Sequence, residues 1–225
     1  MLMRRLLHIL GVLVVASGLA AGSIALMSGP ASAAACSGPV PAGTACTITG
    51  TVDLTGGTLT LTSPTSLGWT GTLNGLSQSL VDTTAGDQQY TVNDATGTGA
   101  GWHVTTSATT FTNGSHTFPD TGTFVTNGST SSITATTAPT ATCSSGPGAC
   151  TLPTNSTTYP AAITTAASSP TPVLIYDTAA ATGLGQIVIG GSAAANPVGW
   201  WVNVPSSASA GSYTSTITME IISGP

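Results

Sequence analysis

Basic side chains are almost absent from this sequence. Its 225 residues contain two arginines, Arg4 and Arg5, and no lysine, against seven aspartates and glutamates. Binding to nucleic acid depends on cationic contacts to phosphate, so the composition argues against a nucleic-acid partner. It also argues against recognition of anionic wall polymers by charge. A Lys–Asn isopeptide cross-link cannot form in a chain without lysine.

Side chains that carry chemistry are sparse and scattered. No motif pairs two carboxylates as glycoside hydrolysis requires, and no G-x-S-x-G nucleophile elbow occurs. Asp82, Asp87, Asn93 and Asp94 could offer oxygens to calcium, but their spacing fits no EF-hand loop. Carboxylates in turns more often hydrogen-bond the backbone. We therefore expect no enzymatic activity, no cofactor and no metal.

Long apolar runs are absent except at the N-terminus. Arg4 and Arg5 precede an apolar stretch from Leu6, and Ala-Ser-Ala at 31–33 provides the small residues of a cleavage site. We predict a secretory signal over residues 1–33, with cleavage after residue 33 or up to residue 35. No later run approaches the about 18 apolar residues of a membrane span. Without its signal the chain has no basic side chain left, and its seven acidic groups give a formal charge of −7.

The four cysteines of the chain occur as two closely spaced pairs. In an exported chain four cysteines indicate disulfides, and two short Gly/Pro-rich loops favour the pairs Cys36–Cys46 and Cys143–Cys150. A metal site is the alternative, although no histidine or further cysteine accompanies either pair. Acylation of Cys36, as in lipoproteins, is a weaker alternative, because Ala33 stands where a larger aliphatic residue is expected.

Apolar and polar residues alternate with a period of two in several segments of the sequence. It predicts an all-β fold, an antiparallel β-sandwich with long loops, as one domain over residues 36–225. In TITGTVDL, Ile48, Val52 and Leu54 share a face, and Gly56-Gly57 suggests a hairpin that returns through residues 59–61. The remaining strand candidates are 67–73, 90–92, 102–108, 173–176, 186–190, 200–204 and 213–222. Residues 113–150 read as a loop-rich insertion with one or two short strands.

A glycine-rich loop introduces the first tryptophan of interest. Residues 97–104 read GTGAGWHV, so the loop delivers Trp102 onto a strand. A tryptophan that alternates with valine is more often a core residue than a ligand platform. Trp200-Trp201 raises the same question, since adjacent strand residues point to opposite faces. One of the two rings should therefore be buried. The other is a candidate for stacking on a sugar, but packing under a loop is the more usual position for such a ring.

Two segments resemble the WxL-domain family of Gram-positive cell-surface proteins. They are DATGTGAGWHVTTSATTF and the C-terminal PSSASAGSYTSTITMEIISGP. The first WxL-like motif is Trp102-His103-Val104, with valine in place of leucine. The second is formed by Tyr213, Ile217, Thr218, Met219, Glu220 and Ile221, with Met219 in place of tryptophan and Ile221 in place of leucine. The chain is similar to divergent, Ala/Thr/Gly-rich members of actinobacterial type.

The resemblance implies a protein at the cell surface or in the cell wall that binds peptidoglycan non-covalently. It also implies that the WxL-like segments are required for that binding. Other surface proteins are further candidate partners. The alternative function is a structural or adhesive surface subunit that self-associates or binds another protein.

Overall fold

Short strands and turns make up the described chain. The computed structural model describes residues 34–146 and 149–225, and it shows no helix among them. No helix in that part is long and apolar enough to cross a membrane. The predicted signal over residues 1–33 lies outside the described residues.

The contacts within the chain divide it after Asp53 into two units. In the first unit, β1 (Ala34–Ala35) and β2 (Cys46–Thr47) form a parallel pair. The Cys36–Cys46 disulfide closes the loop between them and confirms the predicted pairing. Residues 48–53 continue from β2 without forming a strand.

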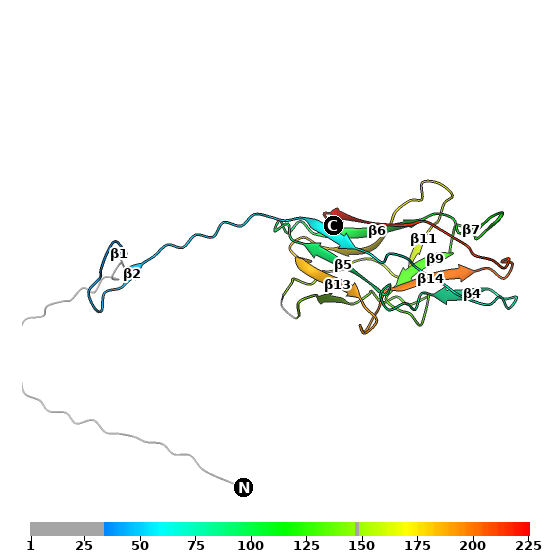
Figure 1. Ribbon diagram of the computed structural model, residues 1–225, viewed down its shortest axis with the longest axis horizontal. Coiled ribbons are helices and arrows are strands. Elements are labelled where there is room, and N and C mark those ends of the chain that lie inside the picture. Colours follow the sequence, from blue (N-terminus) through cyan, green and yellow to red (C-terminus); the bar gives the residue numbers. More distant parts are fainter. Residues whose placement is uncertain (1–33, 147–148) are drawn as a thin grey trace, which may run out of the picture. The chain divides into compact units, whose positions relative to one another are not determined.

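The second unit, residues 54–225, contains four antiparallel sheets (Figure 1). The first sheet has the order β10 (Ala141–Cys143), β13 (Gly185–Gly190), β5 (Gln89–Asp94) and β3 (Leu59–Thr62). The second has the order β11 (Ala161–Ile163), β9 (Phe124–Asn127), β14 (Gly199–Val204) and β4 (Gln78–Val81). The third has the order β12 (Val173–Thr178), β6 (Trp102–Ala108) and β15 (Ile217–Ser223), and β7 (Thr112–Asn113) pairs with β8 (His116–Thr117). The all-β, sandwich-like prediction is confirmed.

The core forms where the inward faces of these sheets meet. Along β6, Trp102, Val104, Thr106 and Ala108 are buried, as their alternation predicts. Val92, Ile187, Ile189, Phe124 and Trp200 are fully or almost fully buried with them. Burial of large apolar side chains is the main stabilising contribution to such a fold. The core therefore contains most of the aromatic rings that the sequence analysis singled out.

The predicted hairpin at Gly56-Gly57 is wrong. Both glycines continue an extended segment, in which the Gly57 amide donates to the Ala95 carbonyl at 2.7 Å. A Cβ on Gly56 would lie 2.3 Å from the Thr96 carbonyl oxygen. Glycine is required here because two backbones approach closely, and not because the chain turns.

Two other segments differ from their predictions. Residues 67–73 form no strand, although Leu67 and Trp69 are half-buried and pack against the core. Within 113–150, β9 is a central strand with all four residues buried, so this region contributes to the sandwich as well as to its loops. The sequence of β9, Phe-Val-Thr-Asn, has no apolar alternation from which to recognise a strand.

Candidate functional site

The two WxL-like segments lie side by side. β6 and β15 pair antiparallel along their full lengths, with Val104 opposite Ile221 and Trp102 opposite Ser223. Along β15, Ile217, Met219 and Ile221 are half-buried, while Thr218 and Glu220 are exposed. The fold thus brings together motifs that are more than a hundred residues apart in the sequence.

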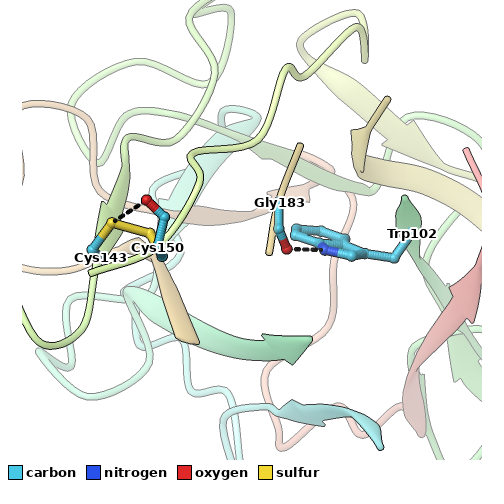
Figure 2. The surroundings of a disulfide bond; sticks show 4 residues. All are labelled: Trp102, Cys143, Cys150 and Gly183. Atoms are coloured by element: carbon cyan, nitrogen blue, oxygen red, sulfur yellow. Dashed lines mark hydrogen bonds between the residues drawn. A yellow bond between two sulfur atoms is a disulfide. The ribbon is translucent and has the colours of Figure 1, made fainter. Parts of the chain in front are cut away.

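Trp102 is a core residue. It is 0% exposed, and its Nε1–H donates to the Gly183 carbonyl at 2.9 Å (Figure 2). Its ring stacks on Tyr176 with ring centroids 6.2 Å apart. A Cβ on Gly183 would lie 2.8 Å from Trp102 Nε1, so glycine is needed at that position. Trp102 therefore holds the start of β6 in the core and offers no face to a ligand.

The Cys143–Cys150 disulfide supports the same region of the sandwich. It confirms the predicted pairing, with Cα atoms 5.4 Å apart. Cys143 ends β10, which pairs with β13, and the Thr151 amide donates to the Leu184 carbonyl at 2.9 Å. The disulfide thus fixes the chain beside the turn that accepts the Trp102 hydrogen bond (Figure 2).

His103 and Glu220 lie on the outward side of the same pair of strands. His103 Nδ1 lies 2.7 Å from the Gly224 carbonyl, so its N–H donates to that oxygen. Glu220 is exposed, as is Thr218. These side chains secure the C-terminus or face solvent, and the structure does not gather them into a cleft.

Trp200 and Trp201 are both buried, at 0% and 6% exposure. Trp200 stacks on Phe124 and donates from Nε1 to the Asp87 carbonyl at 2.9 Å. Trp201 donates from Nε1 to the Ser129 carbonyl at 2.9 Å, so it packs under a loop. Packing, the favoured interpretation, therefore holds for both rings, and neither leaves an open face on which a sugar could stack.

The remaining tryptophan occupies a different position. Trp69 is half-buried, and its Nε1–H donates to the Trp200 carbonyl at 2.9 Å. Its ring meets Phe111 edge to face, with centroids 5.8 Å apart. Nearby, Tyr213 stacks on Phe118 with centroids 4.0 Å apart. Trp69, Phe111 and Tyr213 are shared by the linings of two hollows.

The first, which we call the hydroxyl-lined hollow, has a volume of about 440 Å³. Three residues of the second WxL-like segment, Tyr213, Ile217 and Met219, line it. Serine and threonine supply most of its polar groups, and no Asp, Glu or His lines it. Its full lining is residues 63–69, Phe111, 213–215, Ile217 and Met219.

The second, which we call the apolar hollow, has a volume of about 640 Å³. Leu80, Phe111, Phe118, Val202 and Val204 give it an apolar floor. The rest of its lining is residues 69–73, Gln78 and 208–213. It is likewise without charged side chains.

Sequence reasoning found Tyr213, Ile217 and Met219 but missed Trp69, Phe111 and Phe118 as lining residues. The usable signal was local: a half-apolar segment, Leu67-Gly68-Trp69, set among serines and threonines. Such a composition combines an aromatic surface with many hydroxyls, as ligand sites often do.

Asp87 and Tyr176, whose pKa values are raised, line neither hollow. Burial, and next the neighbouring Asp82 carboxylate, raises the pKa of Asp87. Burial, and next the charge of Asp177, raises the pKa of Tyr176 to about 12, so its phenol stays neutral. Asp82 accepts hydrogen bonds from the amides of Gly68 and Thr84, as expected of a carboxylate in a turn.

No metal centre is formed by the part of the chain that the structure describes. Groups of three or more His, Cys, Asp or Glu side chains in positions to hold an ion do not occur there. Asp94, one of the calcium candidates, instead accepts hydrogen bonds from the amide and hydroxyl of Thr96.

Comparison with known proteins identifies no relative. No protein-family model, no curated protein and no solved structure matches this chain. The resemblance to the WxL-domain family therefore stays a prediction, and the functional argument depends on the geometry of the site.

Proposed function

We propose that the protein is secreted and associates non-covalently with the peptidoglycan cell wall, without a catalytic step. The observation that supports this most is the lining of the hydroxyl-lined hollow. Tyr213, Ile217 and Met219 belong to the segment that the family resemblance links to wall binding, and all three line that hollow.

The chemistry of the hollow suits a neutral, hydroxyl-rich ligand. Exposed Ser63, Thr65 and Ser66 each offer a hydroxyl that can donate and accept a hydrogen bond. Trp69 and Tyr213 add aromatic surface, on which the apolar face of a sugar ring can pack. The amino sugars of a glycan strand carry both kinds of group.

The negative charge of the protein favours the glycan strand, and not the anionic polymers of a wall, as its ligand. The mature chain has no basic side chain, and its seven acidic groups repel anions. The hollow itself is uncharged, so when a neutral sugar segment binds there, no charged group of the protein or the ligand loses its hydration. Removing an unpaired charge from water is costly.

The prediction is tested by adding a charge to the hollow. Thr65→Glu places a carboxylate at an exposed lining position, and we expect it to weaken binding about tenfold, because that charge loses water without gaining a partner. The matched control is Thr142→Glu, which makes the same substitution at an exposed position of β10, outside both hollows and both WxL-like segments. The measurement is the fraction of purified chain that sediments with isolated peptidoglycan, at several wall concentrations.

Equal binding by the two variants would contradict the assignment of the hydroxyl-lined hollow. Failure of the wild-type chain to sediment would contradict wall binding itself. Circular dichroism of each variant shows whether a loss of binding reflects a loss of fold.

A further inference from the structure

Three large apolar side chains near the N-terminus are exposed. Ile48, Val52 and Leu54 are 84%, 80% and 90% exposed. They alternate with Thr49, Thr51 and Asp53 in the segment TITGTVDL, residues 47–54. This is the pattern of a strand with one apolar face, yet residues 48–54 pair with no strand among residues 34–146 and 149–225. Exposed apolar residues arranged in this way are typical of an interaction surface.

The same chain contains an apolar site of matching character. In the apolar hollow, Leu80 of β4 lies opposite Val202 of β14, and Val204 follows on the same face. β4 is an edge strand that pairs only with β14, so one side of its backbone has no strand partner. Leu73, 43% exposed, lies at the hollow as well.

The point at which the donated segment joins the sandwich and the apolar hollow lie at opposite ends of β6. Leu54 precedes Gly57, which bonds to Ala95 before β6 begins. The apolar hollow is lined by Phe111, which follows the end of β6. Seven residues of β6 span about 23 Å, whereas Val52 can reach only about 7 Å from Leu54. Val52 and Leu54 therefore cannot reach the hollow of their own chain, and a second copy can receive them.

We propose that residues 47–54 of one copy dock as a donated strand in the apolar hollow of a second copy. Strand donation of this kind combines backbone hydrogen bonds with the burial of alternate side chains. Here Ile48, Val52 and Leu54 would face the hollow, and Asp53 would face away. Because the two contact surfaces differ and lie at opposite ends, copies join head to tail and the assembly does not close by itself.

Charge sets the conditions for this association. The hollow is uncharged and the donated face is apolar, whereas each mature chain carries seven acidic groups and no basic one. Burial of apolar side chains therefore favours association of two copies, and repulsion between their acidic groups opposes it. Salt screens that repulsion, so association strengthens as salt increases. The proposal does not rest on wall binding, since it uses the apolar hollow, although Trp69, Phe111 and Tyr213 line both hollows.

Sedimentation of the chain that starts at Ala34 tests the proposal. We expect its average mass to increase with concentration and with salt. Val52→Asp adds a charge to the donated face, and we expect association to need at least about tenfold more protein. The matched control, Thr51→Asp, adds the same charge to the opposite face and leaves association within about twofold of wild type.

Mixing two variants tests the acceptor. Leu73→Glu changes an exposed residue of the hollow. At protein concentrations at which the wild type just associates, we expect this variant to be monomeric alone, as Val52→Asp is. Mixed together, they form dimers and nothing larger, because one supplies the intact strand and the other the intact hollow. A monomeric wild type, equal effects of Thr51→Asp and Val52→Asp, or no dimer in the mixture would each overturn the proposal.

Discussion

Trp102→Ala is expected to destabilise the protein by about 3–5 kcal/mol, the usual cost of removing a large aromatic side chain from a core. The ring is 0% exposed and stacks on Tyr176, so its loss leaves a cavity at the start of β6. Urea unfolding, followed by circular dichroism, measures the change in the free energy of unfolding. We expect the midpoint of the unfolding transition to move to a lower urea concentration than in the wild type.

The matched variant for this site is Trp102→Phe. It keeps an aromatic ring but removes the Nε1–H that bonds to Gly183, leaving that buried carbonyl unpaired. The cost of an unpaired buried group is about 1–3 kcal/mol, so this variant should be less destabilised than Trp102→Ala. Should Trp102→Ala unfold within about 1 kcal/mol of wild type, the ring would not be the core residue described here.

Gly199→Ala is expected to cost about 3 kcal/mol or more, at the upper end of what overpacking costs. An added Cβ would lie 1.8 Å from the Ser129 carbonyl and 2.7 Å from Trp201 Nε1. Ser129 accepts the Trp201 hydrogen bond, so moving either group also disturbs that bond. The free energy of unfolding in urea is again the measurement.

Gly86→Ala is the control for this substitution. Nothing lies within 4 Å of a Cβ at Gly86, so the change should be neutral or slightly stabilising, within about 1 kcal/mol. Similar stabilities for Gly199→Ala and Gly86→Ala would show that the Ser129 loop does not pack against β14 as described.

The sheets and disulfides could be predicted from the sequence because their signals are local. Alternation along a strand depends only on which side each residue faces, and residues 213–222 alternate in burial as expected. Along 102–108 the expected inward residues are buried, but Thr105 and Ser107 on the other face are buried as well. Cys143 and Cys150 lie close together in the chain, which limits the choice of partner. The pairing of β6 with β15 is not local, and only the family resemblance placed those segments in one module.

The sequence is ambiguous where glycine or tryptophan has two physical uses. Gly56-Gly57 fits a hairpin, but the same absence of a side chain allows close approach to Thr96. Trp200 and Trp201 fit a sugar platform, but indole N–H groups also find buried carbonyl partners, and both do so here. Which use applies depends on segments distant in the sequence, so no local pattern could decide.

All four tryptophans of the chain donate from Nε1 to a backbone carbonyl, but they differ in access. Trp102, Trp200 and Trp201 are buried, whereas Trp69 is half-buried and lines both hollows. A glycan ligand can therefore reach only one of the four indoles. This difference allows the binding site to be located directly.

The most direct test of wall recognition is a titration of ¹⁵N-labelled protein with soluble, uncharged oligosaccharides of N-acetylated amino sugars, followed through the four indole N–H signals. We predict that the Trp69 signal shifts, together with the amides of Thr65 and Ser215, while the Trp102, Trp200 and Trp201 signals stay in place. No shift at any glycan concentration, or shifts confined to the buried indoles, would contradict recognition of the glycan strand in the hydroxyl-lined hollow.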